Sequence, residues 1–376
     1  MKSVFFYVQH LLGIGHLSRA ATLARALAEG GFDVLLVSGG APVSLDLGRA
    51  RLHQLPPVRA RDDGLRELVR VDGRPFDEDF RSERVGELLA LLEAEKPAIL
   101  ITEQFPFGRT QLRFELMPLL DAARAMTPRP LIVSSVRDVV RRSASPRRVA
   151  ETVEIFSAFD LALIHADPKL VPFGDSFAAW DQIAARAAYT GYVTPDEPPP
   201  SASNAGKGEV IVSVGGGAVG APLLKAAIAA RPKSRLADRD WRLLVGDNLP
   251  ESERTQLGRA EGIVVEPARR DFTTLLSNAT LSISQAGYNT VIETLRFADR
   301  AVLVPFSTPR ETEQSDRARL LSERGLITVT PAETLSGDSL ACAIDRALAA
   351  PSIRSLPPCD ARGAATTVDL LRARTA

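Results

Sequence analysis

The sequence predicts an α/β protein made of two doubly wound domains, each with a parallel sheet between layers of helices. Short apolar runs alternate with helical patterns along the chain, which is typical of βαβ units. A proline-rich stretch without an apolar run, residues 194–208, interrupts this alternation once. With 376 residues, the chain is also longer than one domain usually is. We therefore expect an N-terminal domain at 1–193, a linker at 194–208, a C-terminal domain at 209–355 and a terminal segment at 356–376.

Six apolar runs in the first half have the length of buried strands. They are Ser3–Gln9, Asp33–Ser38, Ala98–Thr102, Leu131–Ser135, Leu161–His165 and Ala188–Tyr192. A helix is expected between the first two, because apolar residues recur at i, i+3, i+4 and i+7 across residues 20–27. It should end at Gly30 and Gly31, since glycine commonly follows the last residue of a helix.

The alternation of strands and helices restarts after the linker. The expected strands are Val210–Val214, Trp241–Val245, Gly262–Val265, Leu281–Ser284, Ala301–Pro305 and Ile327–Thr330. The expected helices are Pro222–Ala230, Phe272–Ala279, Thr290–Ala298, Glu313–Arg324 and Ser339–Ala349. The terminal segment 356–376 is expected to form a helix that packs on the N-terminal domain.

Composition and charge exclude several classes of protein. The 46 Lys and Arg residues balance the 46 Asp and Glu residues, so no overall field favours nucleic acid or an anionic membrane. Two cysteines are too few for a zinc site or a disulfide framework, which suits a reducing, cytoplasmic location. Glycines and polar residues interrupt the apolar N-terminus too early for a signal peptide, and no run of 18 apolar residues predicts a membrane-spanning helix. Contact with a membrane surface stays open.

The loop after the first strand combines glycines with one of four histidines. Gly13 and Gly15 allow the backbone to turn tightly and to approach a ligand, and a helix N-terminus favours negative charge. His16 and Arg19 follow at the start of the helix, where a histidine can act as a base or bind an anion. The third glycine of a dinucleotide-binding loop is missing, which argues against NAD. A purely structural turn is the alternative.

A second glycine loop, "VSVGGGAVG", follows the first strand after the linker. Gly215, Gly216 and Gly217 precede an expected helix and leave backbone N–H groups free to bind phosphate. The segment lacks the Gly-Lys-Ser/Thr of a P-loop, so it does not indicate ATP hydrolysis. A flexible glycine turn is the alternative.

The segment "SISQAGYNTVIETL" runs from a strand through a glycine loop into a helix. Thr290 begins the expected helix, and Glu293 lies one turn later on the same side. A carboxylate so placed can accept hydrogen bonds from two vicinal hydroxyls, such as those of a ribose. Gln285, Gly287 and Asn289 complete this candidate site. The alternative is that Glu293 only complements the helix dipole.

Polar residues also follow other strands. Glu313 and Gln314 begin the expected helix that follows the apolar run Ala301–Pro305. Carboxylate and amide groups can form hydrogen bonds with sugar hydroxyls. A solvated helix cap is the alternative. Ligands of open α/β sheets bind at the carboxyl ends of the strands, so strand-end residues of the first half could line the other wall of a crevice. These residues are Glu103, Arg109, Arg137, Asp138 and His165. A structural or solvated role is the alternative for each.

Together these features resemble the GT-B fold glycosyltransferases, in which two Rossmann-like domains face each other across a cleft. The group that the chain resembles is the MurG-type, family 28, and the resemblance covers nearly the whole chain. The more specific match is C-terminal, where the family's polar residue, glycine, threonine and acidic residue correspond to Gln285, Gly287, Thr290 and Glu293. Glu313 and Gln314 stand where the family has a pair that contacts the donor sugar.

The resemblance implies an inverting, metal-independent transfer of a hexose from a nucleotide sugar, UDP-linked, to an acceptor hydroxyl. Glu293 would bind the ribose hydroxyls, and Glu313 and Gln314 would contact the transferred sugar. His16 would be the general base, since the pKa of an imidazole suits that task. Helix termini and loop amides would stabilise the leaving diphosphate, so neither a metal nor a cofactor is expected. The residues implied around the diphosphate are Gly215, Gly216, Gly287 and Thr290.

In such enzymes the first domain carries the acceptor, which makes the strand-end residues of this half acceptor-side candidates. They are Gly13, Gly15, Arg19, Glu103, Arg109, Arg137, Asp138 and His165. The chain departs from the MurG pattern here, because its opening glycine loop is shorter and "TEQFPFGR" stands near the place of the second glycine loop. The acceptor, the nucleotide base, the sugar and the oligomeric state therefore stay open. No nucleic-acid partner is expected.

Two alternative functions use the same features. The opening "GIGHLSRA" is also similar to the loop of the nucleotide-sugar hydrolase of pseudaminic acid synthesis, in which the histidine would help water to attack. A non-catalytic protein that binds a nucleotide sugar is the second alternative. UDP-N-acetylglucosamine 2-epimerases share the fold, but the sequence shows no convincing set of their acidic catalytic residues.

Overall fold

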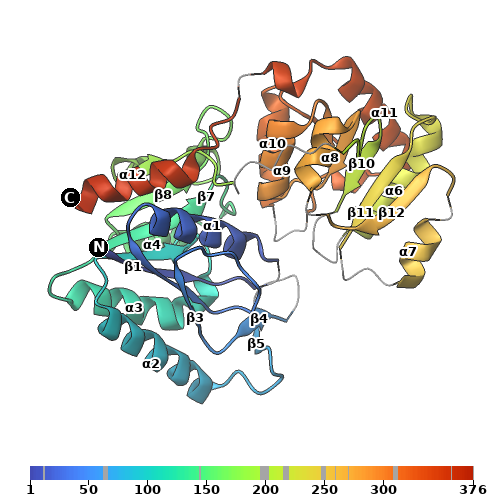
Figure 1. The fold of residues 1–376 in the computed structure, drawn as a ribbon. Helices are drawn as coiled ribbons and strands as arrows, with labels where there is room; N and C mark the ends of the chain where they lie inside the picture. Colours follow the sequence, from blue (N-terminus) through green and yellow to red (C-terminus); the bar gives the residue numbers. More distant parts are fainter. Residues whose placement is uncertain are drawn as a thin grey trace. The chain divides into compact units, whose positions relative to one another are not determined.

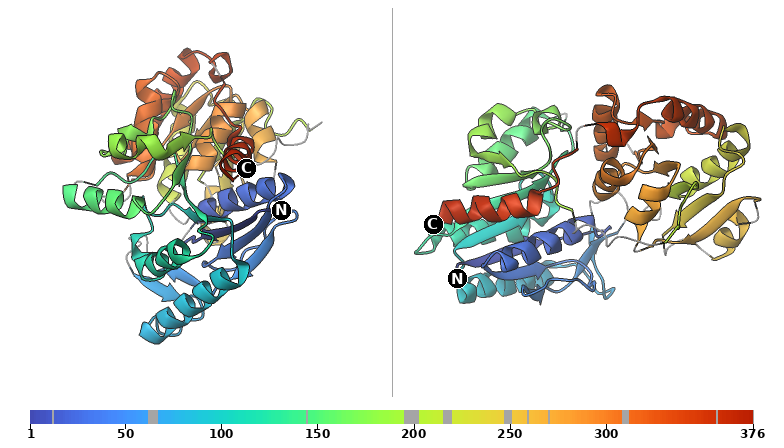
Figure 2. Two further views of the ribbon diagram at one scale, coloured as in Figure 1. Left: turned by 90° about the vertical axis from the view of Figure 1, so that its left-hand side faces the viewer. Right: turned by 45° about the horizontal axis from the view of Figure 1, so that its top comes forward.

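The chain folds into two compact units. The computed structural model describes residues 1–11, 13–61, 67–143, 145–194, 203–214, 220–246, 251–258, 260–269, 271–307, 312–356 and 358–375. Unit 1 comprises Met1–Pro195 together with Asp360–Ala376, and unit 2 comprises Asp196–Cys359. Each unit is a parallel sheet covered by helices (Figure 1 and Figure 2). The predicted class, α/β with two doubly wound domains, is confirmed.

The sheet of unit 1 runs in the order β3-β2-β1-β6-β7-β8-β9, and its neighbouring strands are parallel. Its strands are β1 (Ser3–Val8), β2 (Asp33–Ser38), β3 (Arg51–Gln54), β6 (Ile99–Glu103), β7 (Leu131–Arg137), β8 (Leu161–His165) and β9 (Ala187–Tyr189). A separate antiparallel pair consists of β4 (Val58–Ala60) and β5 (Leu68–Arg70). The sequence did not predict β3, β4 and β5. β3 is a polar edge strand, and the other two are too short to show a period.

Helices cover both faces of this sheet. Apolar side chains of β1, including Val4 and Phe6, pack against α1 (Gly15–Glu29) and α12 (Gly363–Thr375). The opposite face carries α2 (Glu78–Glu95) and α3 (Arg113–Ala125), which lie side by side (Figure 1). Two more helices are α4 (Pro146–Phe156) and α5 (Trp180–Ile183). Because strands of this sheet are buried on both faces, they are nearly continuous apolar runs, which is why the sequence revealed most of them.

A charged group is completely buried between the sheet and the α2–α3 pair. Arg84 of α2 donates two hydrogen bonds of 2.8 Å to the Glu115 carboxylate of α3, and the Tyr7 hydroxyl of β1 donates to the same carboxylate. Arg84 also donates to the carbonyl oxygen of Gly39, after β2, at 3.3 Å. None of the three side chains has exposed surface, so each depends on the others for its hydrogen bonds. Burial and the neighbouring carboxylate raise the pKa of Tyr7 well above its ordinary value.

The C-terminal helix α12 packs on α1. Val368 and Leu371 of α12 join the same apolar core as Leu27 of α1. Arg372 donates to the carbonyl oxygen of Gly30, the residue that follows α1, at 2.9 Å. The last part of the chain therefore completes the core of unit 1 by covering an apolar helix face that would otherwise be exposed.

The sheet of unit 2 runs in the order β12-β11-β10-β13-β14-β15, and its neighbouring strands are also parallel. Its strands are β10 (Val210–Ser213), β11 (Trp241–Val245), β12 (Ile263–Pro267), β13 (Leu281–Ser284), β14 (Ala301–Leu303) and β15 (Thr328–Val329). Its helices are α6 (Ala221–Ala230), α7 (Glu251–Leu257), α8 (Phe272–Asn278), α9 (Tyr288–Phe297), α10 (Glu313–Glu323) and α11 (Gly337–Ala349). Val210 and Val212 pack against α6 and α11, whereas Ile211 packs against α8 on the other face.

Three helices of unit 2 differ from the expectation by two residues or more, and one of them, α11, begins at Gly337 instead of Ser339. Helix α9 begins at Tyr288, two residues before the predicted Thr290, because Gly287 takes an extended conformation (φ −63°, ψ 149°) and serves as the N-cap. Helix α7 was not predicted, because its sequence, "ESERTQL", is too short and too polar to show an apolar stripe. The structure places α10 at Glu313, where the sequence predicted a helix start.

Both sheets reverse their strand order at an equivalent place. In unit 1 the chain runs from β1 outward to β3 and then returns to the other side of β1 as β6, and in unit 2 β10 and β13 have the same relation. Open α/β sheets bind ligands at the carboxyl ends of the strands, at this topological switch point. The switch points therefore locate one candidate site in each unit.

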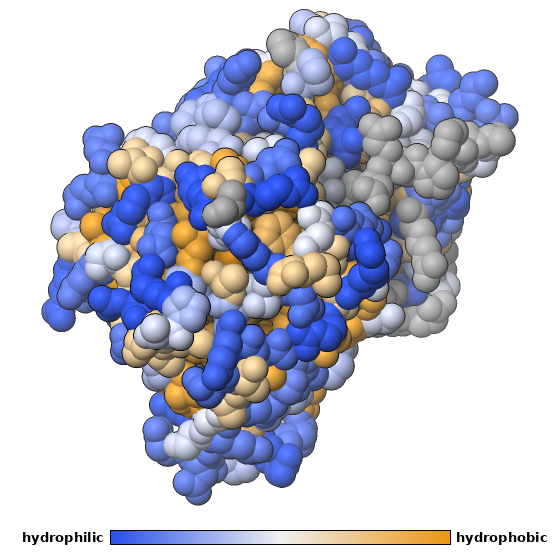
Figure 3. Space-filling model, turned by 60° about the vertical axis from the view of Figure 1, so that its left-hand side comes forward, coloured by the Kyte–Doolittle hydropathy of each residue, from blue (hydrophilic) through white to orange (hydrophobic). Residues whose placement is uncertain are grey.

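Apolar and hydrophilic side chains are mixed on the face of the molecule that Figure 3 draws. Hydrophilic side chains predominate there, and apolar ones lie among them. The large apolar side chains with high exposure are scattered along the chain at Met1, Ile14, Leu52, Val71 and Val264. In the part of the chain that the structure describes, no helix is both long and apolar enough to cross a membrane. Contact with a membrane surface stays open.

Candidate functional site

At the switch point of unit 1, His16 lies beside a buried carboxylate. His16 is in the first turn of α1, after the loop that leaves β1, and Glu103 ends β6. Nδ1 of His16 lies 3.0 Å from Oε1 of Glu103. Arg19, one turn further along α1, donates to the same oxygen, and its Nη2 lies 3.2 Å from Nδ1 of His16. Exposure is 8% for His16, 3% for Arg19 and 1% for Glu103, so the group is shielded from water.

The surroundings of His16 favour its neutral form. Burial lowers the pKa of His16 well below its ordinary value, and the positive charges of Arg109, Arg137 and Arg19 lower it further. A carboxylate paired with an arginine accepts, which favours the tautomer in which Nδ1 of His16 donates to Glu103, while Nη2 of Arg19 favours the opposite tautomer from 3.2 Å. With the proton on Nδ1, Nε2 is the unprotonated nitrogen. The site therefore presents a neutral imidazole with an oriented basic nitrogen.

A chain of hydrogen bonds continues from Glu103 across the neighbouring strands. Ser135 of β7 donates to Oε2 of Glu103 at 2.6 Å. The hydroxyl of Ser135 lies 3.0 Å from Nε2 of His165, the last residue of β8. Nδ1 of His165 in turn lies 2.8 Å from the hydroxyl of Thr190. Ser135 and His165 have no exposed surface, and Thr190 is 1% exposed.

The other acceptor-side candidates lie at the same edge of the sheet but have different surroundings. Arg109, in a left-handed backbone conformation (φ 58°), donates to the carbonyl oxygen of Gln9 at 2.9 Å. Arg137 ends β7, and the completely buried Asp138 follows it and accepts from the N–H of Val139 at 2.8 Å. His165 is completely buried, so it can influence a ligand only through its neighbours. Contact of any of these residues with an acceptor stays a prediction.

His10 and Ser135 are two residues of this edge that the sequence did not single out. His10 is 4% exposed, and its Nδ1 has no hydrogen-bond partner among the described residues. A Cβ added at Gly40 would meet the His10 ring at 2.3 Å, so the two strand ends are closely packed. His10 lies in the opening loop and could have been noticed there, but Ser135 gave no signal because serine is common inside strands and its partners are distant in sequence.

At the switch point of unit 2, the predicted donor residues gather where β13 meets α9. Gln285 and Gly287 form the loop after β13, and Asn289 and Thr290 lie in the first turn of α9. Glu293 follows one turn later and is half-buried. Burial raises the pKa of Glu293 to about 7, and the positive charge of Arg296 opposes this shift only in part. The fold thus holds a carboxyl group where its ionisation is unfavourable.

Gln314 and Arg317 hold the loop after β13 from helix α10. Oε1 of Gln314 accepts two backbone hydrogen bonds of 3.0 Å, from the N–H groups of Ala286 and Phe306. Arg317, one turn later and 1% exposed, donates to the carbonyl oxygen of Ala286 at 2.9 Å. Gln314 therefore joins the loops that follow β13 and β14, and only its NH₂ group is left to reach a ligand. Arg317 gave no sequence signal, because its partner is a backbone atom on a distant loop.

Two further predictions concern this unit. Glu313 is 8% exposed and begins α10, which puts its carboxylate at the end of the helix that favours an anion. Gly215, Gly216 and Gly217 lie outside the described residues.

The described chain contains no group of three or more His, Cys, Asp or Glu residues placed to hold a metal ion. Metal independence stays a prediction.

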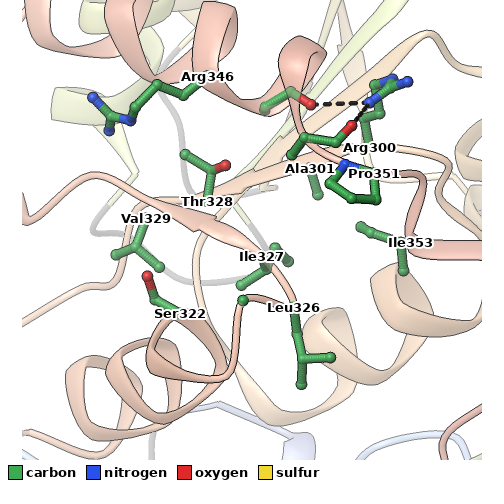
Figure 4. Close-up of a pocket in the computed structure, with 13 residues that line it drawn as sticks. Arg300, Ala301, Ser322, Leu326, Ile327, Thr328, Val329, Arg346, Pro351 and Ile353 are labelled. Atoms are coloured by element: carbon green, nitrogen blue, oxygen red, sulfur yellow. Dashed lines mark hydrogen bonds between the residues drawn. The ribbon is translucent and has the colours of Figure 1, made fainter. Parts of the chain in front are cut away.

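A cavity of about 270 Å³ in unit 2 lies away from the switch point. Its lining includes Ala301, the first residue of β14, and Ile327 and Thr328 at the start of β15. Figure 4 shows Arg300 at its rim, donating to backbone carbonyls of Ala347 and Ala350. The cavity is thus at the amino ends of these strands, the edge of the sheet opposite to the candidate donor residues.

Comparison with known proteins identifies the C-terminal unit. Residues 211–356 match the glycosyltransferase family 28 C-terminal domain. One curated relative is the UDP-N-acetylglucosamine–N-acetylmuramyl-(pentapeptide) pyrophosphoryl-undecaprenol N-acetylglucosamine transferase of Phenylobacterium zucineum, with 31% identity over 150 residues. The match covers 39% of this chain and 41% of that transferase, so the chain spans about two fifths of the length of the relative.

Solved structures match nearly the whole chain. MurG of Acinetobacter baumannii has a TM-score of 0.63 and 16% identity, with 99% of this chain and 100% of that one covered. UGT2 of Phytolacca americana, solved with UDP-2-fluoro-glucose and pterostilbene, has a TM-score of 0.62 and 14% identity, with both chains covered completely. The spinosyn rhamnosyltransferase SpnG, solved with thymidine diphosphate, has a TM-score of 0.58 and 18% identity, with 98% and 95% covered. These likenesses show the GT-B fold, and the resemblance to MurG-type proteins is confirmed.

Proposed function

We propose, from the family 28 C-terminal domain at residues 211–356, that this protein is a glycosyltransferase. It would move a hexose from a UDP-linked nucleotide sugar to an acceptor hydroxyl, with inversion at the anomeric carbon and without a metal ion. The observation that carries the proposal is that the matched range includes every candidate donor residue, from Gly215 to Gln314. The geometry at the two switch points supports it.

The start of α9 is suited to a diphosphate. The first N–H groups of a helix lack intrahelical partners, and the helix dipole favours an anion there. A Cβ added at Gly287, the N-cap, would meet no described atom within 4 Å, and the backbone there has φ −63°, which any residue can adopt. The fold itself therefore does not require glycine at this position. A phosphate that lies against the backbone would require it.

The raised pKa of Glu293 is a second argument for a ligand at α9. A carboxyl group in these surroundings does not stabilise the protein when it ionises, because burial raises its pKa to about 7. Two ribose hydroxyls that donate to the carboxylate would favour the charged form and replace the lost water. The nucleotides bound in UGT2 and SpnG, which share the fold, suit the same interpretation.

His16 is the proposed general base. Glu103 accepts the Nδ1–H of His16, so Nε2 is free to take the proton of the attacking hydroxyl. As the acceptor oxygen forms its bond to the anomeric carbon, the bond from that carbon to the diphosphate breaks, and the diphosphate leaves with the electron pair. The Glu103 carboxylate then stabilises the imidazolium, as the carboxylate of a catalytic triad does.

The open space at the opening loop agrees with this role. A Cβ added at Gly13 or Gly15 would meet no described atom within 4 Å, and neither residue has the positive φ that favours glycine. A purely structural turn therefore does not explain these glycines. A substrate that approaches the backbone beside His16 would explain them.

The test is a donor assay in which transfer and hydrolysis can be distinguished. UDP sugars and other nucleotide sugars are first screened by thermal shift, since a ligand at 100 times its Kd stabilises by about 2.7 kcal/mol. The stabilising donor is then incubated with and without alcohol acceptors while nucleotide release is measured. Release that depends on an acceptor supports transfer. Fast stoichiometric release into water favours the hydrolase instead, and binding without any release would leave only a binding protein.

A further inference from the structure

We propose that Ser135 and His165 are positioning residues for Glu103 and, through it, for His16. This inference rests on the function proposed above, in which Nε2 of His16 takes the acceptor proton. Ser135 and His165 have no exposed surface, so neither can touch a substrate. They act by holding the carboxylate that orients the general base.

The register of the sheet brings these residues together. Glu103 of β6 and Ser135 of β7 are paired positions of neighbouring parallel strands, so their side chains project on the same face of the sheet. His165 ends the next strand, β8, and its Nε2 lies 3.0 Å from the Ser135 hydroxyl. Thr190 follows β9 and lies 2.8 Å from Nδ1 of His165. The chain from Glu103 to Thr190 thus crosses the carboxyl ends of four adjacent strands.

The Glu103 carboxylate sets the direction of the hydrogen bonds of Ser135 and His165. The Glu103 carboxylate only accepts, so the single proton of the Ser135 hydroxyl is donated to Oε2. Ser135 must then accept from His165, which fixes the proton of His165 on Nε2. Nδ1 of His165 lies 2.8 Å from the Thr190 hydroxyl, which also lies 2.8 Å from the carbonyl oxygen of Gly191 and 3.3 Å from that of Ile164. The donors of Ser135 and His165 therefore point toward Glu103.

This arrangement holds both oxygens of the carboxylate. Oε1 faces Nδ1 of His16 and also accepts from Arg19, and Oε2 accepts from Ser135. A carboxylate held at both oxygens cannot rotate about its terminal bond, so Oε1 stays directed at the imidazole. Precise support of this kind is needed because a functional side chain must stay within about half an ångström of its productive position.

The charge of His165 supports the same conclusion. Burial lowers the pKa of His165 well below its ordinary value, and the positive charge of Arg19 lowers it further. A neutral His165 keeps one donor and one acceptor nitrogen, as the chain requires. It therefore orients the Ser135 hydroxyl without adding a charge beside Glu103.

The experiment compares Ser135→Ala with Ser134→Ala. Ser134 is a matched control, since it is on the same strand, has no exposed surface and donates to the carbonyl oxygen of Phe105 at 2.8 Å instead of to Glu103. Ser135→Ala should lower kcat about 10-fold, the equivalent of one hydrogen bond to a charged group, with KM for the donor unchanged. A carboxylate with one donor fewer stabilises the imidazolium more strongly, so the acid limb of the kcat–pH profile should also move up by roughly half a unit. Ser134→Ala should leave that limb in place.

Variants of His165 test the next link. His165→Leu removes the donor to Ser135 and should reproduce part of the kcat loss and of the shift in the acid limb. His165→Gln places an NH₂ group near the position of Nε2 and should restore both values to near those of the wild type. A His165→Leu enzyme with wild-type kcat and pH profile would contradict the inference.

A double-mutant cycle separates positioning from general damage to the fold. In a His16→Ala background, Ser135→Ala should cause no further loss, because its effect passes through His16. Additive losses would show a merely structural role and overturn the inference. If His16→Ala keeps the turnover of the wild type, the proposed general base is wrong. If only Ser135→Ala keeps it, the general base stands and the inference about Ser135 is wrong.

Nitrogen NMR of the wild-type protein provides a readout that needs no variant. The ¹⁵N shifts of His165 should report the Nε2–H tautomer and a neutral ring from pH 5 to 8. The opposite tautomer would place the proton beside Thr190, leave the Ser135 hydroxyl without its donor, and overturn the inference even if every variant failed to fold.

Discussion

The two sheets reverse their strand order in the same way, yet the residues at the two switch points differ in kind. In unit 1 the ends of β1 and β6 carry a buried charged group, in which Glu103 accepts from His16 and Arg19. In unit 2 the ends of β13 and β14 are joined by the neutral amide of Gln314, which accepts from two backbone N–H groups. The same topology therefore carries a buried charged group in one unit and a loop that leads into a helix N-terminus in the other. Strand order determines where a site lies, and side chains determine its chemistry.

The two sites also differ in how far their ionisable groups are stabilised. Glu103 has three donors around it, whereas Glu293 is half-buried and its pKa is raised to about 7. A carboxylate with its hydrogen bonds satisfied is ready to orient a neighbour. A carboxyl group that ionises unfavourably is suited to a ligand that supplies the missing donors.

The largest expected effect is that of His16→Ala on turnover. Loss of a general base typically costs about 10²–10⁴-fold in rate, while nucleotide affinity should be unchanged, because the candidate donor residues belong to unit 2. Turnover and nucleotide binding of the variant are measured side by side. His53→Ala is the control, since His53 pairs with Glu87 at 2.7 Å on the edge strand β3. Turnover within threefold of the wild type would show that His16 is not the general base.

The second effect concerns the stability of unit 1. Arg84→Ala leaves the Glu115 carboxylate buried without its partner and should lower the free energy of unfolding by about 3–5 kcal/mol. Denaturant unfolding measures the change. Arg319→Ala is the control, because Arg319 is an exposed residue of α10 whose pair with Glu323 (2.8 Å) should contribute less than about 0.5 kcal/mol. Equal losses in the two variants would contradict the distinction between buried and exposed pairs.

A third prediction uses the pH dependence of Glu293. The pKa of this carboxyl is raised from its ordinary value near 4.5 to about 7 in the folded protein. Between these values the folded protein holds a proton that the unfolded chain releases, so stability falls as pH rises through this window and stays low above it. Glu293→Gln removes this cost and should raise the free energy of unfolding by on the order of 1–3 kcal/mol at pH 8, with little difference near pH 4.

The same variant tests the role of Glu293 in binding. Glu293→Gln should weaken nucleotide binding while it stabilises the protein at pH 8, as is expected where a functional group costs stability. Thermal unfolding and nucleotide titration at pH 5 and pH 8 measure both properties. If the variant binds nucleotide with the affinity of the wild type, Glu293 does not contact the nucleotide and only complements the helix dipole.

The last prediction separates two roles of Gln314. Gln314→Ala leaves the N–H groups of Ala286 and Phe306 without their acceptor and should cost about 1–3 kcal/mol of stability. Gln314→Glu keeps the acceptor oxygen and loses only the NH₂ group. It should therefore keep most of the stability and lose affinity for a donor sugar, measured against the nucleotide alone. Unchanged sugar affinity would mean that Gln314 serves only to hold the loops.

Most strands could be predicted from the sequence because buried parallel strands are local apolar runs. The predicted strand Asp33–Ser38 coincides with β2, and Leu161–His165 coincides with β8. Helix α2 had not been predicted, since its buried residues form a narrow stripe at four-residue spacing that includes a charged residue, Arg84. A pattern of apolar residues cannot reveal a helix that buries an ion pair.

The candidate site was predictable only where its residues are neighbours in sequence. The loop with His16 and the segment with Glu293 each show a motif within about ten residues. Ser135, Arg317 and the partners of Gln314 depend on contacts between distant segments. The residue types serine, arginine and glutamine do not by themselves predict a role in the site, because their partners become neighbours only when the sheet forms.

The sequence by itself determined the order of the buried strands, the two glycine-containing segments and the place of His16 after the first strand, because these depend on local patterns of apolar and flexible residues. Only the tertiary structure decided which groups meet at the carboxyl edges. It placed Glu103 against His16, 87 residues away in the chain, and it buried His165 behind Ser135. Parallel strands joined by helices put residues from distant segments side by side, and the burial that results decides which of them are charged, which donate and which accept.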